Sequence, residues 1–204
     1  MSKKQNNKDW TGNSQTVYKN IGASNHTESE RQSHDYYATE PKAVTMLLVL
    51  EKFEGKIWEC ACGEGHLSEE MKRLVYEVYS TDLINRGYGD GQVDFLGIEN
   101  HETIDMNIIT NPPYIYANEF IEKALDIMTE GNKLALIMPI RYLEGKARKR
   151  IFTDTPPKVL YISSSRIKCA INGNFDTMSG SAVSYAWFVW QKGHKEDTIL
   201  KWFN

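Results

Sequence analysis

The sequence predicts an α/β domain in which helices cover both faces of a mainly parallel sheet. Short apolar segments of strand character alternate along the chain with amphipathic helical segments, the order that βαβ units produce. Residues 134–138 (LALIM) are apolar throughout, as expected of a strand buried on both faces. In such folds ligands bind at the carboxyl ends of the strands, where the candidate motifs of this chain fall.

Length and composition fit one globular domain. The 204 residues are enough for a single core, with 41% hydrophobic and 25% charged residues. No apolar run approaches the roughly 20 residues of a membrane helix, and the first ten residues lack the apolar core of a signal peptide. We therefore expect a cytoplasmic protein. The net charge of −3 decides nothing about nucleic acid, because phosphate binding depends on local charge.

The chain divides into a polar N-terminal arm (residues 1–34) and a domain (residues 35–204). Thr39 and Pro41 predict a helix start, with a capping hydroxyl and a proline in the first turn. The two prolines after residue 110 end a strand, because proline cannot donate a ladder hydrogen bond. The predicted strands are residues 56–60, 78–81, 104–110, 134–138, 159–163 and 182–190, and further helices are predicted around residues 67–75 and 117–128.

A glycine-rich turn, residues 59–65 (ECACGEG), joins the first of these strands to a helix. Glycines let the backbone approach a ligand, and the following helix begins with free amide donors. Ser68 stands where a dinucleotide-binding loop has its third glycine. Glu59, four residues before Gly63, favours instead the loop of methyltransferases, because a carboxylate suits the cationic amino group of S-adenosylmethionine.

Two further acidic positions suit the nucleoside part of that cofactor. Asp82 closes the second strand, where a carboxylate can accept hydrogen bonds from both ribose hydroxyls. Asp94 can accept from the adenine amine, and the Phe95 ring can cover the adenine face. Each feature is weak alone, but their order along the chain predicts S-adenosylmethionine binding.

The most specific signal is Asn-Pro-Pro-Tyr (residues 111–114, the NPPY motif), directly after an apolar strand. The N6 amine of adenine is a poor nucleophile because its lone pair is delocalised into the ring. The Asn111 amide oxygen and the Pro112 carbonyl can accept its two N–H groups, and the prolines, including Pro113, hold the acceptors rigid. Tyr114 can stack on an extruded base.

With these motifs, the chain resembles the DNA adenine-N6 methyltransferases that carry the NPPY motif, especially the small solitary enzymes of phages and other mobile elements. The resemblance includes residues 36–44 and 186–190 and spans nearly the whole chain. It implies a Rossmann-like class I methyltransferase domain with a mostly parallel seven-stranded sheet, and a double-stranded DNA substrate. It implies cofactor contacts from Tyr37, Thr39, Pro41, Glu59, Cys60, Ala61, Gly63, Gly65, Asp82, Leu83, Asp94, Phe95 and Asn111. The short chain leaves room for a homodimer on a palindromic site.

Two segments are candidates for DNA contact. The densest basic run follows the strand at residues 134–138, and a solvated helix face explains it as well as a phosphate clamp does. Residues 163–180 form a long polar loop of the kind that is often functional. The polar arm can also order on DNA. The candidate DNA-binding residues are Arg141, Lys146, Arg148, Lys149, Arg150, Arg166 and Lys168.

Several alternatives remain open. The NPPY motif also serves enzymes that methylate RNA base amines or the glutamine amide of release factors, and a non-catalytic binding module could keep the same fold. Cytosine-C5 methylation is not favoured, because no cysteine follows a proline. No metal site is predicted: Cys60, Cys62 and Cys169 lack a second ligand pair at zinc spacing, and they are predicted to be small buried thiols.

Overall fold

The computed structural model describes residues 38–99, 103–165, 167–170 and 183–203, all within one compact unit that spans residues 32–204. The predicted polar arm (residues 1–34) and the predicted contacts of Tyr37 and Arg166 lie outside the described residues. The same holds for residues 171–180 of the predicted DNA-contacting loop.

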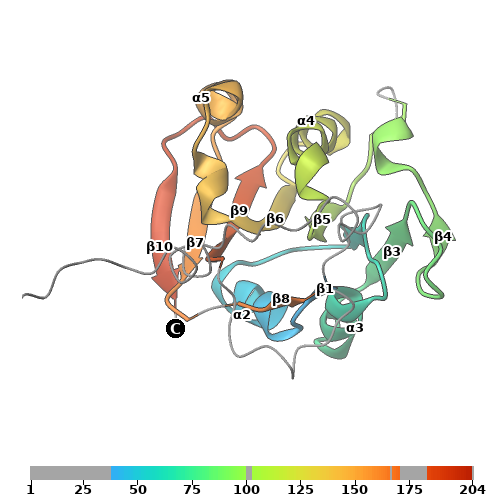
Figure 1. The fold of residues 1–204 in the computed structure, drawn as a ribbon. Helices are drawn as coiled ribbons and strands as arrows, with labels where there is room; N and C mark the ends of the chain where they lie inside the picture. Colours follow the sequence, from blue (N-terminus) through green and yellow to red (C-terminus); the bar gives the residue numbers. More distant parts are fainter. Residues whose placement is uncertain (1–37, 100–102, 166, 171–182, 204) are drawn as a thin grey trace, which may run out of the picture. The chain divides into compact units, whose positions relative to one another are not determined.

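A mixed sheet forms the centre of the described unit (Figure 1). Its strand order is β10-β7-β9-β6-β5-β2-β3-β4. All neighbouring strands are parallel except β9, which runs antiparallel to β6 and β7, so the predicted mainly parallel sheet is confirmed. The strands are β2 (Ile57–Glu59), β3 (Val78–Asp82), β4 (Gly91–Gln92), β5 (Asn107–Thr110), β6 (Lys133–Pro139), β7 (Val159–Ser163), β9 (Tyr185–Gln191) and β10 (Ile199–Phe203).

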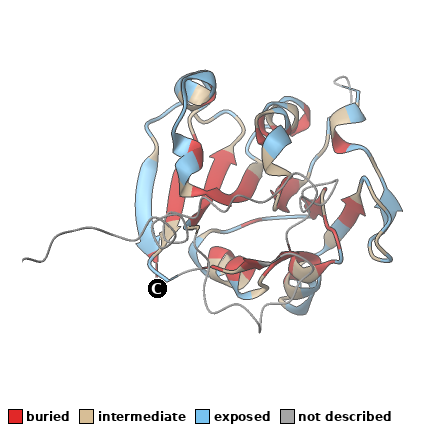
Figure 2. Cartoon of the chain, in the orientation of Figure 1, coloured by how far each residue is buried: buried red, intermediate tan, exposed pale blue. Residues whose placement is uncertain are grey.

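The predicted count of seven strands is wrong, because the described sheet has eight. The sequence indicated neither edge strand: β4 pairs with the end of β3, and β10 pairs in parallel register with β7 over its five residues. Four of the five β10 residues are exposed, as the pale blue of β10 in Figure 2 shows. A strand without a buried face has no alternation of apolar and polar residues, so its sequence carries no strand period.

Helices cover both faces of the sheet, as predicted. Helices α2 (Lys42–Leu50) and α3 (His66–Arg73) lie on one face, and α4 (Ala117–Ile127) and α5 (Lys149–Asp154) lie on the other (Figure 1). Consecutive strand residues point to opposite faces, so each strand supplies two cores. Trp58, Ile108, Leu136 and Phe188 pack with α4, whereas Ile57, Ile109, Ile137 and Trp187 pack with α2 and α3. Within the described ranges, no helix combines the length and apolarity needed to cross a bilayer.

The start of α2 differs from the prediction. Thr39 does not cap the helix: it belongs to β1 (Ala38–Thr39), which pairs antiparallel with β8 (Cys169–Ala170). Pro41 occupies the N-cap position, and no side chain caps the helix there. The Thr39 hydroxyl lies 3.8 Å from the Cys169 Sγ instead. A long-range strand pair therefore replaces the local cap.

The strand order reverses beside β2. From β2 the chain continues to β3 and β4 on one side, and β5 returns to the other side of β2 before the order proceeds to β6. Ligands of open α/β sheets bind at such a switch point, outside the carboxyl ends of the strands. The glycine-rich turn follows β2 and the NPPY motif follows β5, so both meet there.

We predict that Val75→Gly stabilises the fold. Val75 follows α3 with φ of 69° and is 92% exposed, so a β-branched residue holds a conformation that favours glycine and gains no packing. The free energy of unfolding, measured by urea denaturation, should rise by about 0.5–1 kcal/mol. Val49→Gly, at an exposed site inside α2, is the matched control and should lower it by roughly 0.5 kcal/mol. A loss of stability in Val75→Gly would contradict the strain.

Candidate active site

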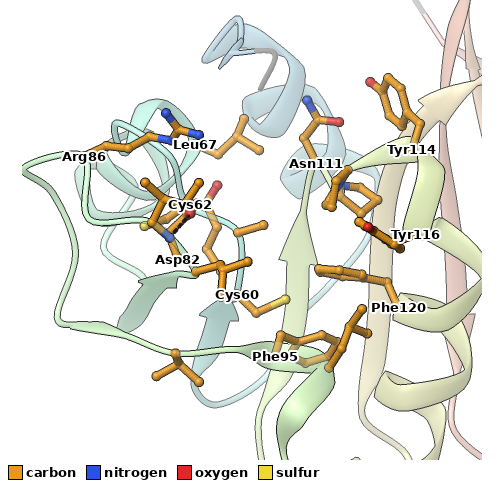
Figure 3. A pocket seen from close by; sticks show the side chains of 18 of the residues that line it. Cys60, Cys62, Leu67, Asp82, Arg86, Phe95, Asn111, Tyr114, Tyr116 and Phe120 are labelled. Carbon is orange, nitrogen blue, oxygen red and sulfur yellow. Dashed lines mark hydrogen bonds between the residues drawn. The ribbon is translucent and has the colours of Figure 1, made fainter. Parts of the chain in front are cut away.

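The carboxyl ends of β2, β3 and β5 surround a cavity of about 370 Å³. This volume lies in the range of small-molecule sites. Figure 3 shows Asp82 and Arg86 on one wall, Asn111 and Tyr116 on the opposite wall, with Cys60 and Phe95 between them. The structure brings together these predicted residues around the cavity: Thr39, Glu59, Cys60, Ala61, Asp82, Leu83, Asp94, Phe95, Asn111, Pro112, Pro113 and Tyr114.

Three predicted cofactor residues do not line the cavity and instead shape its surroundings. Pro41 is the N-cap of α2. Gly65 starts α3 with φ of 85°, and a Cβ there would lie 2.5 Å from the Tyr88 ring. Gly63 also has a positive φ, 56°. The two glycines are therefore required by the turn and by the close approach of Tyr88.

Asp82 fastens the glycine-rich turn to the end of β3. Its Oδ2 accepts a hydrogen bond from the Gly63 amide at 2.8 Å, and its Oδ1 accepts from the Ile84 amide at 2.9 Å. These donors fix the orientation of a half-buried carboxylate. Each oxygen has a second lone pair, so the group can still accept hydrogen bonds from a ligand in the cavity.

Glu59 is a buried carboxyl held by a serine pair. It is 2% exposed and accepts a hydrogen bond from the Ser68 hydroxyl, which lies 2.7 Å from the Ser80 hydroxyl. Desolvation raises the pKa of Glu59 to about 8, and the negative charge of Asp82 acts in the same direction. A cation in the cavity would favour the ionised form and lower this pKa.

The three cysteines are free and buried, as predicted. Burial raises the pKa of Cys62 and Cys169 to about 12 and that of Cys60 well above its usual range. The thiols therefore stay protonated and behave as small apolar groups. Among the described residues, no three His, Cys, Asp or Glu side chains form a group that could hold a metal ion.

An aromatic cluster forms the floor of the cavity. The Phe95 ring is 3% exposed, meets Trp58 edge-on with centroids 5.3 Å apart, and lies 4.9 Å from Phe120. Asp94 is exposed, and its Oδ1 accepts the Leu96 amide at 3.1 Å at the start of η2 (Phe95–Gly97). This cap fixes the backbone that presents Phe95.

The last three residues of the NPPY motif are held by packing and by a backbone hydrogen bond. Pro112 is buried, and Pro113 takes an extended conformation before η3 (Tyr114–Tyr116). The Tyr116 amide donates to the Pro113 carbonyl at 2.9 Å. The Tyr114 ring packs 6.3 Å from Tyr185, and burial holds the pKa of its hydroxyl well above the usual range. Tyr114 is therefore a neutral aromatic group at the cavity edge.

The basic run separates into exposed cations and cations engaged by the protein. Arg141, Lys146 and Lys149 are exposed. Arg148 donates to the Tyr142 and Glu144 carbonyls at 2.8 and 2.7 Å, and its guanidinium lies 4.4 Å from the Tyr142 ring centroid. Arg150 pairs with Glu122 at 3.3 Å. Outside this run, the main-chain amide of Lys168 donates to the Glu40 carboxylate at 2.8 Å. Arg148 thus organises the segment.

Comparisons with known proteins identify the architecture. No family model matches the chain. The type II restriction enzyme and methyltransferase RM.BcgI of Heyndrickxia coagulans is 27% identical over 156 residues, which cover 66% of this chain and 23% of that protein. The chain therefore spans less than a quarter of the length of this relative.

Three solved structures share this fold, and two of them are described as methyltransferases. A protein assigned as an RNA methyltransferase from Pyrococcus horikoshii superposes with a TM-score of 0.55 at 16% identity, covering 85% of this chain and 96% of that one. A protein assigned to the class I S-adenosylmethionine-dependent methyltransferases, from Listeria monocytogenes, gives 0.54 at 12%, with 79% and 63% covered. The chain has the class I methyltransferase fold. The type IIG restriction endonuclease BpuSI gives 0.51 at 11%, with 76% and 25% covered.

On this class I methyltransferase fold, several cavity residues had not been predicted. Ile115 and Tyr116 directly follow the NPPY motif, and Phe120 lies one helical turn further on, so their positions next to the motif were the available signal. Arg86 lies in an irregular loop after β3. Nothing in the local sequence pattern marks it as a cavity residue.

We predict that Glu59→Gln changes the pH dependence of stability. The folded pKa of about 8 exceeds the ordinary value of 4.5, so between these values the folded protein keeps a proton that the unfolded chain releases. The wild type should therefore lose up to about 1.4 kcal/mol of unfolding free energy per pH unit across this window, relative to the variant. Urea denaturation at a series of pH values measures this. A difference between the two proteins that does not change with pH would contradict the shift.

Proposed function

We propose that the protein transfers a methyl group from S-adenosylmethionine to the N6 amine of an adenine extruded from double-stranded DNA. The observation that carries the proposal is the NPPY motif at the end of β5, facing a cavity whose other wall holds Glu59 and Asp82. The restriction-modification relative favours DNA as the substrate.

The residues on the β2 and β3 side fit S-adenosylmethionine. The cavity has the volume of a cofactor site and combines two carboxylates with an apolar aromatic floor. Glu59 would hold the cationic amino group, and Asp82, oriented by two main-chain amides, would accept the ribose hydroxyls. Asp94 and Phe95 would contact the adenine ring. When bound, the cofactor supplies an electrophilic methyl group on a sulfonium.

The residues on the β5 side fit a planar amine. The Asn111 amide oxygen and the Pro112 carbonyl accept the two N–H groups of the target amine, which turns its lone pair toward the cofactor side of the cavity. Pro112 is buried and the Pro113 carbonyl accepts the Tyr116 amide, so the backbone that carries the two acceptors is restricted before the positive charge develops on the nitrogen. Tyr114 offers a neutral ring against the base.

The exposed cations on the carboxyl side of β6 would contact the DNA backbone. Arg141 follows β6 in η4 (Ile140–Leu143), and Lys146 and Lys149 follow shortly after. Phosphate contacts position a duplex without reading its sequence. Arg148 would contribute indirectly, because its hydrogen bonds to the Tyr142 and Glu144 carbonyls hold the segment in place. Arg150 would exchange its exposed partner Glu122 for a phosphate.

We predict that Asn111→Ala abolishes methyl transfer and leaves cofactor affinity within about twofold, because the variant loses the acceptor of the target amine but keeps the main chain of residue 111 beside the cofactor. Transfer of labelled methyl groups to DNA and calorimetric titration with S-adenosylmethionine measure the two properties. Asn132→Ala is the matched control, since Asn132 precedes β6 at the opposite end of the sheet. Full activity of Asn111→Ala would remove the proposed mechanism.

For Asp82→Ala, we predict that cofactor affinity is the property that is lost. Loss of the carboxylate removes the ribose acceptor and frees the Gly63 amide, so cofactor affinity should fall about tenfold or more in calorimetry. Asp126→Ala, an exposed carboxylate on α4, should leave affinity unchanged. If Asp82→Ala binds the cofactor as tightly as the wild type, the ribose role is excluded.

A further inference from the structure

Exposed apolar side chains rim the mouth of the cavity. Leu83, Ile115 and Tyr116 all line it and are 54%, 69% and 48% exposed. Leu83 follows Asp82 on the cofactor wall, whereas Ile115 and Tyr116 follow the NPPY motif on the base wall. Large apolar side chains left in water beside a cavity mark a surface that a ligand covers.

The backbone on both sides of Ile115 is restrained by packing and hydrogen bonds. On its N-terminal side Tyr114 packs on Tyr185, and on its C-terminal side Ala117 is fully buried at the start of α4. The Tyr116 amide donates to the Pro113 carbonyl, and the Ala117 amide donates to the Tyr114 carbonyl. A side chain on such a turn can be pushed into a partner without much reorganisation of its support.

The same turn is tied to the basic segment. The Asn118 side chain, one residue into α4 from Ala117, accepts a hydrogen bond from the Tyr142 hydroxyl of η4. Arg148 covers the Tyr142 ring and binds the carbonyls around it. The segment that carries exposed Arg141 and Lys146 is therefore tied to the first turn of α4, which follows directly after Ile115 and Tyr116. A supported apolar tip on an element bonded to a basic segment fits a polyanion with an apolar interior, which describes a base-stacked duplex.

We propose that Ile115, backed by Tyr116, is a wedge that inserts into the DNA base stack at the position vacated by the target adenine. The inference rests on the proposed function and adds the step that gives the enzyme access to its base. Extrusion of a base sacrifices its stacking and pairing, and an apolar side chain in the gap recovers contact and blocks its return. Tyr116, beside Phe120 in Figure 3, supports the wedge from the cavity wall.

The test compares paired with unpaired targets. Ile115→Ala should lower kcat/KM about tenfold or more on a duplex that carries the site methylated by the wild type. The defect should largely disappear when the target adenine stands opposite an abasic position, because little pairing then opposes extrusion. Fluorescence of 2-aminopurine at the target position should rise on binding of the wild type and much less on binding of the variant.

Two further variants control for size and exposure. Ile115→Leu should keep wild-type behaviour, since it retains an apolar branched tip. Leu143→Ala removes a 42% exposed apolar side chain of η4 that does not line the cavity, and it should not discriminate between paired and unpaired targets.

The outcomes separate the two proposals. Wild-type protein that methylates DNA, with Ile115→Ala equally active or equally impaired on both substrates, would exclude the wedge and keep the proposed function. Wild-type protein that methylates neither substrate would exclude the proposed function, and the wedge with it.

Discussion

The reversal of strand order beside β2 is the constraint on which the site depends. Because β5 returns to pair with β2 on the side away from β3, the ends of three strands converge without any loop having to cross the sheet. Glu59, Asp82 and Asn111 each stand at or directly after the end of one of those strands. The pairing of the strands and the cores on the two faces of the sheet therefore bring these three positions together. The chemistry of the site then depends on which residue types occupy them.

The two walls of the cavity meet opposite physical demands. The cofactor wall is polar and close-fitting: Gly65 leaves room for Tyr88, and Asp82 binds the turn through the Gly63 amide. The ionised form of Glu59 is energetically unfavourable on this wall, because burial favours the neutral form unless a cation binds beside it. The wall that carries the NPPY motif is stiff instead, since its two prolines and the hydrogen bond from the Tyr116 amide to the Pro113 carbonyl restrict its backbone. In the proposed function, the first wall contributes binding energy for the cofactor, and the second wall contributes preorganised hydrogen-bond acceptors for the target amine.

The sequence predicts those elements whose residue pattern lies within the element itself, and it does not predict those that depend on a distant partner. Residues 134–138 are apolar at every position because β6 is buried on both faces, and the observed strand extends the prediction by one residue at each end. The pairing of Thr39 in β1 could not be predicted from local sequence, because its partner Cys169 in β8 is 130 residues away in the chain. The residues around Thr39 fit a helix cap equally well. The exposed edge strand β10 shows no period. For the site, the motifs on both walls were predictable from residue type and spacing, whereas Arg86 was not.

The most direct test of the central claim is nucleoside mass spectrometry of unmethylated DNA and, separately, of RNA, each after incubation with the protein and isotopically labelled S-adenosylmethionine. The account predicts labelled N6-methyladenine in DNA and no labelled base in RNA. Label in RNA alone would keep the chemistry of the NPPY motif but contradict the DNA substrate. Absence of label from both nucleic acids would contradict the proposed function itself.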